Sequence, residues 1–159
     1  MSQGLELENF LPYRLSLLSN LASRAIAMHY QETHGLSTTQ WRIIAVLRQF
    51  AGLTASELVE RTAMDKVAIH RAVRGLMERG LVKRREASDD RRRLKLSLSD
   101  AGIFLHSQVA PKAIEFEQAL LSCLNTEEQI QLSSILDKLT TQADHLGQAL
   151  MDELASDSA

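Results

Sequence analysis

The sequence predicts a mainly α-helical fold, and three observations support this prediction. Leucine and alanine dominate the chain while only 4% of the residues are aromatic, a composition that suits helices. Apolar residues recur three or four positions apart through most segments, which is the spacing of one helix face. The exception is residues 94–98, where Leu94, Leu96 and Leu98 alternate with polar residues and predict a strand with one buried face.

The size and composition indicate one ordinary globular domain, residues 1–159, with 45% hydrophobic residues to form its core. No run of about 18 uncharged apolar residues occurs, so we expect no membrane-spanning segment. The first eight residues are acidic rather than basic, which argues against a secretion signal. A single cysteine excludes an internal disulfide. We therefore expect a soluble cytoplasmic protein.

The first predicted helix begins near Phe10 and ends at Gly35. Pro12 falls in its first turn, where the missing N–H costs little. Two apolar rows run along it, formed by Leu11, Leu15, Leu18, Ala22 and Ile26 and by Leu17, Leu21, Ala25 and Met28. Together the rows form a wider apolar face than packing against one partner requires.

The middle of the chain predicts three further helices. Residues 37–40 and 54–57 have the form of capping boxes, a hydroxyl residue followed three positions later by Gln or Glu. The first box opens a strongly apolar helix that ends at Gly52, and the second opens a short helix that ends near Arg61. Asp65 can cap the next helix, whose apolar face is formed by Val67, Ile69, Val73, Leu76 and Met77.

A two-stranded hairpin is expected after these helices. Gly80 suits the left-handed position past the end of the third helix. A basic segment, a turn-rich stretch at 87–90 and the alternating strand at 94–98 follow it. Two helices joined by a short turn and followed by such a hairpin form a winged helix-turn-helix, which we place at residues 36–98.

Basic residues are concentrated in this motif. Residues 61–95 contain 12 Lys/Arg against 5 Asp/Glu, a charge of +7, whereas the rest has 6 against 15, a charge of −9. The formal net charge of −2 therefore hides a basic segment within an acidic chain. A concentrated basic face indicates a nucleic-acid partner better than the overall pI does. We expect double-stranded DNA, because a helix fits the major groove and an arginine-rich hairpin can reach a minor groove or phosphates.

The candidate DNA contacts on the second helix of the motif are Lys66, Val67, Ala68, His70, Arg71 and Arg74. Positions 67, 70, 71 and 74 follow helical spacing and can share one face. Arg71 is expected to bind guanine, because its guanidinium can donate to both major-groove acceptors. Lys66 and Arg74 are expected to meet phosphates, and His70 a base or a phosphate. The alternative is an ordinary solvated helix face.

Three stretches, residues 65–73, 76–82 and 89–102, resemble the MarR family of bacterial transcriptional regulators. The resemblance extends over almost the whole chain and implies flanking dimerisation helices, here 10–35 and 99–154. It also implies that Arg92, with Arg91 and Arg93 beside it, enters the minor groove and that Asp90 holds it through an ion pair. The alternative is that the three arginines belong to a loop that only increases solubility. His70 departs from the family, where a small hydroxyl residue is commoner, and this bears on the preferred operator bases.

Two helices are expected to complete the chain. The first spans Ser99 to Leu124 and should kink at Pro111, whose ring removes a hydrogen bond and crowds the preceding turn. Residues 126–129 are expected to cap the second. That helix carries a heptad seam of Leu132, Leu136, Leu139, Ala143, Leu146 and Leu150. The seam favours a homodimer interface formed with the first helix, and packing within one chain is the alternative.

A ligand pocket is predicted from arginines in the apolar helices, because a guanidinium beside an apolar cleft can bind a carboxylate. Residues 11–20 and 41–43 are similar to regulators of aromatic-acid degradation, some of which respond to hydroxycinnamates or their coenzyme A thioesters. The expected polar groups of the pocket are Arg42, Arg14, Ser19 and Ser23. Alternatively, Arg14 and Arg24 form surface or intersubunit salt bridges and Trp41 belongs to the core.

These observations predict a sequence-specific DNA-binding regulator. We expect a homodimeric repressor of an aromatic-compound degradation operon that binds a pseudo-palindromic operator. A small aromatic acid or its CoA thioester is expected to release it from DNA. The alternative is a winged-helix adaptor that binds protein, which unchanged DNA affinity after substitution of Arg71 and Arg92 would favour.

No enzymatic site is predicted. The sequence has no nucleophile–base pattern and no glycine-rich phosphate loop, so we expect no catalytic residue and no cofactor. The histidines are scattered without convergent ligands, so no metal site is expected. Cys123 lies near a helix end among apolar residues and is expected to be a buried small hydrophobe rather than an oxidation sensor.

Overall fold

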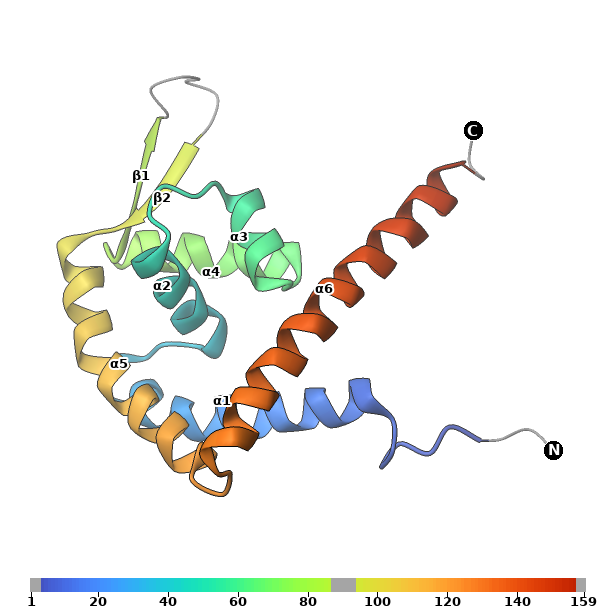
Figure 1. The fold of residues 1–159 in the computed structure, drawn as a ribbon. Coiled ribbons are helices and arrows are strands. Elements are labelled where there is room, and N and C mark those ends of the chain that lie inside the picture. The colour runs from blue at the N-terminus through green and yellow to red at the C-terminus, as the bar shows by residue number, and fades with distance from the viewer. Residues whose placement is uncertain (1–3, 87–93, 157–159) are drawn as a thin grey trace. The chain divides into compact units, whose positions relative to one another are not determined.

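The computed structural model describes residues 4–86 and 94–156 and confirms the mainly helical, winged helix-turn-helix fold (Figure 1). Its elements are α1 (Leu11–His34), α2 (Thr38–Gln49), α3 (Ala55–Thr62), α4 (Lys66–Glu78), β1 (Val82–Glu86), β2 (Leu94–Leu98), α5 (Asp100–Leu121) and α6 (Thr126–Ser156). The chain divides into two compact units, residues 1–116 and 117–159. The first contains the helix-turn-helix and the hairpin.

The core of the first unit lies where α2, α3 and α4 pack together beside the hairpin (Figure 1). Ile43 and Ile44 of α2, Leu58 of α3, and Ile69 and Leu76 of α4 are all fully buried. Each helix supplies these residues from one face, at the spacing that the sequence predicts. The packing fixes the inner face of α4 and leaves its outer face to solvent.

Both predicted capping boxes at the starts of α2 and α3 are present. The Gln40 N–H donates to Ser37 Oγ over 3.1 Å while Gln40 Oε1 accepts the Ser37 N–H over 3.0 Å. Thr54 and Glu57 make the same reciprocal pair at the start of α3. These pairs satisfy backbone donors that the first turn of a helix leaves free. The start of each helix is therefore fixed locally.

The turn between α3 and α4 occupies residues 63–65. Ala63 ends α3 in the left-handed region at φ 50°, a conformation that costs a non-glycine residue about 1 kcal/mol. Asp65 then caps α4 as predicted, its Oδ1 accepting the Ala68 N–H over 2.8 Å. The two features together set the angle at which α4 leaves the turn.

The hairpin is antiparallel, with Val82 opposite Leu98 and Arg84 opposite Leu96. Leu96 and Leu98 are buried as predicted, whereas Leu94 is 38% exposed. An isolated antiparallel bridge between Leu53 and Leu96 was not predicted: the Gly52 N–H donates to Leu96 O over 2.9 Å, and the Leu96 N–H donates to Leu53 O over 2.7 Å. This pairing explains why α2 ends at Gln49 rather than at Gly52.

The start of α5 packs tightly against the end of α4. Gly80 adopts the left-handed conformation at φ 68°, as predicted. Ser99 Oγ donates to Gly80 O over 2.6 Å and accepts the Gly102 N–H over 3.1 Å. A Cβ on Gly102 would overlap the carbonyl oxygen of Leu81, so a glycine is required for this close approach. Further along, α5 continues through Pro111 without interruption, and a kink there stays a prediction.

Two predictions for the second unit are wrong. The capping box of α6 is Asn125 with Glu128, one residue earlier than predicted, with hydrogen bonds of 2.8 and 3.0 Å. Asn is a stronger cap than Thr, and the Glu stands at the position that completes the box. Cys123 is exposed, not buried. The reason is that α5 ends at Leu121 and places Cys123 in the turn.

Candidate nucleic-acid interface and ligand pocket

The outer face of α4 carries most of the predicted helix contacts. Lys66, Val67, His70, Arg71 and Arg74 are exposed, whereas Ile69, Ala72, Val73 and Leu76 are buried. Within the described part of the chain, Arg71 and Arg74 have no hydrogen-bond or ion-pair partner. Their guanidinium groups therefore keep every donor available for an external partner.

Two of the predicted α4 positions differ from expectation. Val67 was assigned both to the apolar face of the helix and to the outer face with the DNA contacts, and its 63% exposure agrees only with the second assignment. The inner face repeats through positions 69, 72, 73 and 76, and Val67 falls on the opposite side with Arg71 and Arg74. Ala68 is half-buried beside the cap at Asp65 and so lies at the edge of the outer face.

The hairpin adds cations that were not among the predicted contacts. Lys83, Arg84 and Arg85 of β1 are all exposed. Arg85 lies directly opposite Lys95 of β2, and Lys83 lies two residues away on the same face. Like charges that face each other across a sheet are destabilising, so this face favours an anionic partner. The predicted wing residues Asp90, Arg91, Arg92 and Arg93 lie outside the described residues.

Arg79 is a functional candidate that sequence reasoning missed. It follows α4 at its C-cap, and its guanidinium donates to the carbonyl oxygens of His34 over 2.6 Å and Gly35 over 3.2 Å. A cation suits the carbonyl end of α1. The contact joins positions 44 and 45 residues apart, and no local pattern in the sequence signals it. It ties the end of α4 to the end of α1.

Three of the four predicted pocket residues come together between α1 and α2. Arg42 Nη2 donates to Ser23 Oγ over 2.8 Å and to Ser19 Oγ over 3.4 Å. A cavity of about 390 Å³ lies here, lined by Asn20, Ser23, Arg24, Ala27, Gln31, Thr38 and Arg42. Of the four predicted residues, Ser23 and Arg42 line it, whereas Ser19 and Arg14 do not.

Among the described residues, none neutralises the charge of Arg42. Arg42 is half-buried, and its described partners are two neutral hydroxyl groups. No described carboxylate forms an ion pair with it, nor with Arg14 or Arg24. A half-buried guanidinium without a counter-ion can bind a carboxylate through charge-assisted hydrogen bonds. The cavity is therefore suited to a small organic acid.

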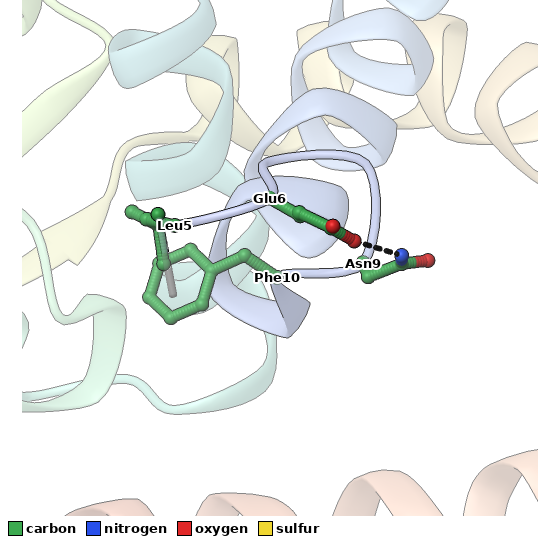
Figure 2. Close-up of a pocket in the computed structure, with 5 residues that line it drawn as sticks. Leu5, Glu6, Asn9 and Phe10 are labelled. Carbon is green, nitrogen blue, oxygen red and sulfur yellow. Dashed lines mark hydrogen bonds between the residues drawn. The ribbon is translucent and has the colours of Figure 1, made fainter. Parts of the chain in front are cut away.

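A second cavity, of about 500 Å³, lies before α1 and is lined by Gly4, Leu5, Glu6, Asn9 and Phe10. Figure 2 shows that the Asn9 side chain donates to the Glu6 carboxylate there, over 3.0 Å. All of its lining residues come from one short stretch, and the one charged group among them is acidic. This cavity does not suit an anionic ligand.

Comparison with known proteins agrees with the fold. A model of the MarR family matches residues 34–93. The transcriptional repressor MdtR of Bacillus subtilis is 29% identical over 113 residues, which cover 71% of this chain and 73% of that protein. The crystal structure of a MarR/EmrR family transcriptional regulator from Acinetobacter superposes with a TM-score of 0.81 at 26% identity, covering 89% of this chain and 99% of that one.

Over residues 34–93 the chain is similar to the MarR family of transcriptional regulators. A further relative is the homoprotocatechuate degradative operon repressor of Escherichia coli. It is 23% identical over 142 residues, which cover 87% of this chain and 93% of that protein. The repressor NicR of Pseudomonas putida is 26% identical over 112 residues, with coverage of 70% and 71%.

An aromatic cluster holds three helices of the first unit together. The Trp41 ring of α2 stacks on His106 of α5 at 5.6 Å and meets Tyr30 of α1 at 5.8 Å between centroids. Burial, and secondly the nearby charge of Arg48, lower the pKa of His106. Trp41 thus packs against the core, in line with the alternative considered for it.

In residues 4–86 and 94–156, no three His, Cys, Asp or Glu side chains are grouped so that they could hold a metal ion. In the same ranges, no helix is both long enough and apolar enough to cross a membrane.

Proposed function

We propose that this protein is a homodimeric repressor of the MarR type that controls an aromatic-compound degradation operon. A small aromatic acid or its CoA thioester releases it from a pseudo-palindromic operator. The observation that carries the proposal for the effector is the half-buried Arg42 guanidinium. It lines a cavity and is held by the hydroxyl groups of Ser19 and Ser23, with no described carboxylate to neutralise it.

The outer face of α4 enters the major groove, where residues early in such a helix meet base edges. Arg71 binds guanine, His70 binds a base or a phosphate, and Lys66 and Arg74 bind phosphates. Their exposure and lack of described partners support these roles. Arg91, Arg92 and Arg93 contact the flanking minor groove, with Asp90 holding Arg92, and Lys83, Arg85 and Lys95 add phosphate contacts.

Dimerisation uses the helices at residues 10–35 and 99–154, which flank the winged helix-turn-helix at 36–98. Exposed apolar residues on α1 and α6 support this assignment: Leu15, Leu18 and Leu21, and Leu136, Leu146 and Leu150, are between 39% and 60% exposed in the single chain. Apolar surface on this scale needs a partner. A two-fold dimer presents two copies of α4 to half-sites about one helical turn apart.

The relatives support the choice of partner and effector class. They are named as transcriptional repressors, which favours DNA over a protein partner for the winged helix. One of them represses a degradative operon for homoprotocatechuate, an aromatic acid. The cavity beside Arg42 suits the carboxylate of such a ligand.

Release follows from a competition for Arg42. A bound carboxylate draws the guanidinium away from Ser19 and Ser23, so the polar link between α2 and α1 changes. Arg79 joins the end of α1 to the end of α4, so a shift of α1 reaches the helix in the major groove. The ligand lowers operator affinity only if it binds the released conformation better than the DNA-bound one.

Thermal-shift measurements test the effector site. The panel is salicylate, 4-hydroxyphenylacetate, 4-hydroxycinnamate and 4-hydroxycinnamoyl-CoA, assayed with the wild type, Arg42→Ala and Arg48→Ala. Arg48 is an exposed arginine on the same helix and serves as the matched control. At least one compound should raise the melting temperature of the wild type and of Arg48→Ala, and Arg42→Ala should abolish the rise. A flat response of the wild type to the whole panel contradicts the proposed effector.

A further inference from the structure

One apolar side chain stands out on the outer face of α4. Val67 is 63% exposed and is the one large hydrophobic residue of this helix that is exposed. The other large apolar side chains of α4 are buried or packed against the core, among them Ile69, Val73 and Met77. Val67 is neither in the core nor packed against it.

The fold gives no reason for a valine at this position. A β-branched side chain loses rotamer freedom in a helix, so valine forms helices less well than alanine, glutamate or lysine. Its exposed apolar surface also gains nothing from folding, because that surface stays in water. The residue therefore costs the free chain a little stability, and contact with another molecule would offset that cost.

The position of Val67 indicates what that contact is. It lies one turn before Arg71 and about two turns before Arg74 on the same face, and one turn of helix advances about 5.4 Å. In the major groove, the apolar group that a base pair presents is the C5 methyl of thymine. An exposed valine beside a guanine-binding arginine is therefore placed to meet a thymine.

We propose that Val67 is a specificity-determining residue whose methyl groups contact the C5 methyl of one thymine in each operator half-site. The thymine lies within about two base pairs of the guanine bound by Arg71, because 5.4 Å of helix corresponds to roughly two base-pair steps of 3.4 Å. This inference rests on the proposed placement of α4 in the major groove. It adds to that placement a thymine in each half-site and names Val67 as the residue that distinguishes this thymine from other bases.

Selection of binding sites from random duplex DNA is the first test. The wild type, Val67→Ser and Val67→Thr are compared, since serine removes both methyl groups and threonine keeps one. The wild type should enrich a thymine at one fixed position of each half-site. Val67→Ser should lose the preference at that position and keep the others, and Val67→Thr should retain it in weaker form. Val67 is exposed, so all three proteins should melt at the same temperature.

Replacing that thymine by deoxyuridine, which lacks only the methyl group, is the second test. The substitution should weaken wild-type binding about fourfold per half-site, the effect of losing one buried methyl group. It should leave Val67→Ser unchanged. Deoxyuridine at each of the other thymines of the site is the internal control and should affect both proteins equally.

The possible failures are distinguishable. If the wild type enriches a site and Val67→Ser enriches the same one, or if deoxyuridine affects both proteins equally everywhere, the inference is overturned while the DNA-binding proposal stands. If the wild type enriches no sequence at all, sequence-specific binding is overturned and the role of Val67 with it.

Discussion

Two helices, α4 and α6, are both amphipathic, but the chain itself buries the apolar face of only one of them. Ile69 and Leu76 of α4 are fully buried against the first unit. On α6, which runs from Thr126 to Ser156, no residue is buried, and the seam residues Leu136 and Leu146 are 41% and 55% exposed. The apolar side of α4 is satisfied by folding, so its other side is available for binding. The apolar side of α6 still requires a surface to cover it.

The largest effect on the free energy of unfolding should come from truncating one leucine on the apolar face of α4 and one on that of α6. Leu76→Ala should lower the free energy of unfolding by about 3 kcal/mol, because it leaves a cavity in a closed core. That loss should be the same at low and high protein concentration in urea denaturation. Leu139→Ala on the seam should instead give a loss that depends on protein concentration, because its partner is a second chain. A concentration-independent loss for Leu139→Ala would show that the seam packs within one chain.

The outer face of α4 is tested next. Arg71→Ala should weaken binding to the selected operator by about 2 kcal/mol, roughly thirtyfold, and relax the preference for guanine at one position. Fluorescence anisotropy at several salt concentrations measures both the affinity and the number of phosphate contacts. Arg24→Ala, an exposed arginine on α1, is the control and should bind as the wild type does. Equal affinities for Arg71→Ala and the wild type would leave α4 without a role in DNA binding.

Removing the hydrogen bonds that join Arg79, at the end of α4, to the end of α1 should have a smaller effect. Arg79→Gln should lower stability by about 1 kcal/mol, since it removes the charge-assisted hydrogen bonds to the carbonyls of His34 and Gly35. The melting temperature measures this loss, and Arg79→Lys should recover part of it by keeping the charge without the fork. The variant should also respond less to effector, because α1 and α4 are then uncoupled. An unchanged response to effector would assign Arg79 a role in stability alone.

The smallest expected effect is a pH dependence at His106. Its pKa is lowered from 6.5, by burial and then by Arg48, so the unfolded chain binds the proton more tightly than the folded one. The associated stability is complete above pH 6.5 and is lost as the pH falls from there through the folded-state pKa. His106→Gln should therefore flatten the decline in melting temperature between about pH 7 and 5. An identical decline in both proteins would place the responsible group elsewhere.

The sequence predicted those features of the structure that depend on residues adjacent in the chain. The capping boxes at Ser37 and Thr54, the cap at Asp65 and the left-handed Gly80 each depend on a few adjacent positions, and each is present in the structure. The cap of α6 was displaced by one residue, because Asn125 competes with Thr126 for the same task.

Contacts between distant positions were harder to predict. The convergence of Arg42 with Ser19 and Ser23 was expected from a family resemblance, whereas the contact of Arg79 with the end of α1 was not expected at all. No periodicity encodes a bond between residues 45 apart. The sequence assigned Val67 to both faces of α4 for a related reason: an apolar residue near a helix start fits either face until the packing of its neighbours is known.

The facing pair of Arg85 and Lys95 gives the hairpin an unusual relation to ionic strength. In the free protein, added salt screens their repulsion and steadies the two strands. In the proposed complex with DNA, the same salt competes with the phosphates that would lie beside Arg85 and Lys95, and so it weakens binding. One ionic strength therefore cannot be optimal for both states. At low salt the repulsion between Arg85 and Lys95 destabilises the free hairpin most, and there an anionic partner stabilises it most.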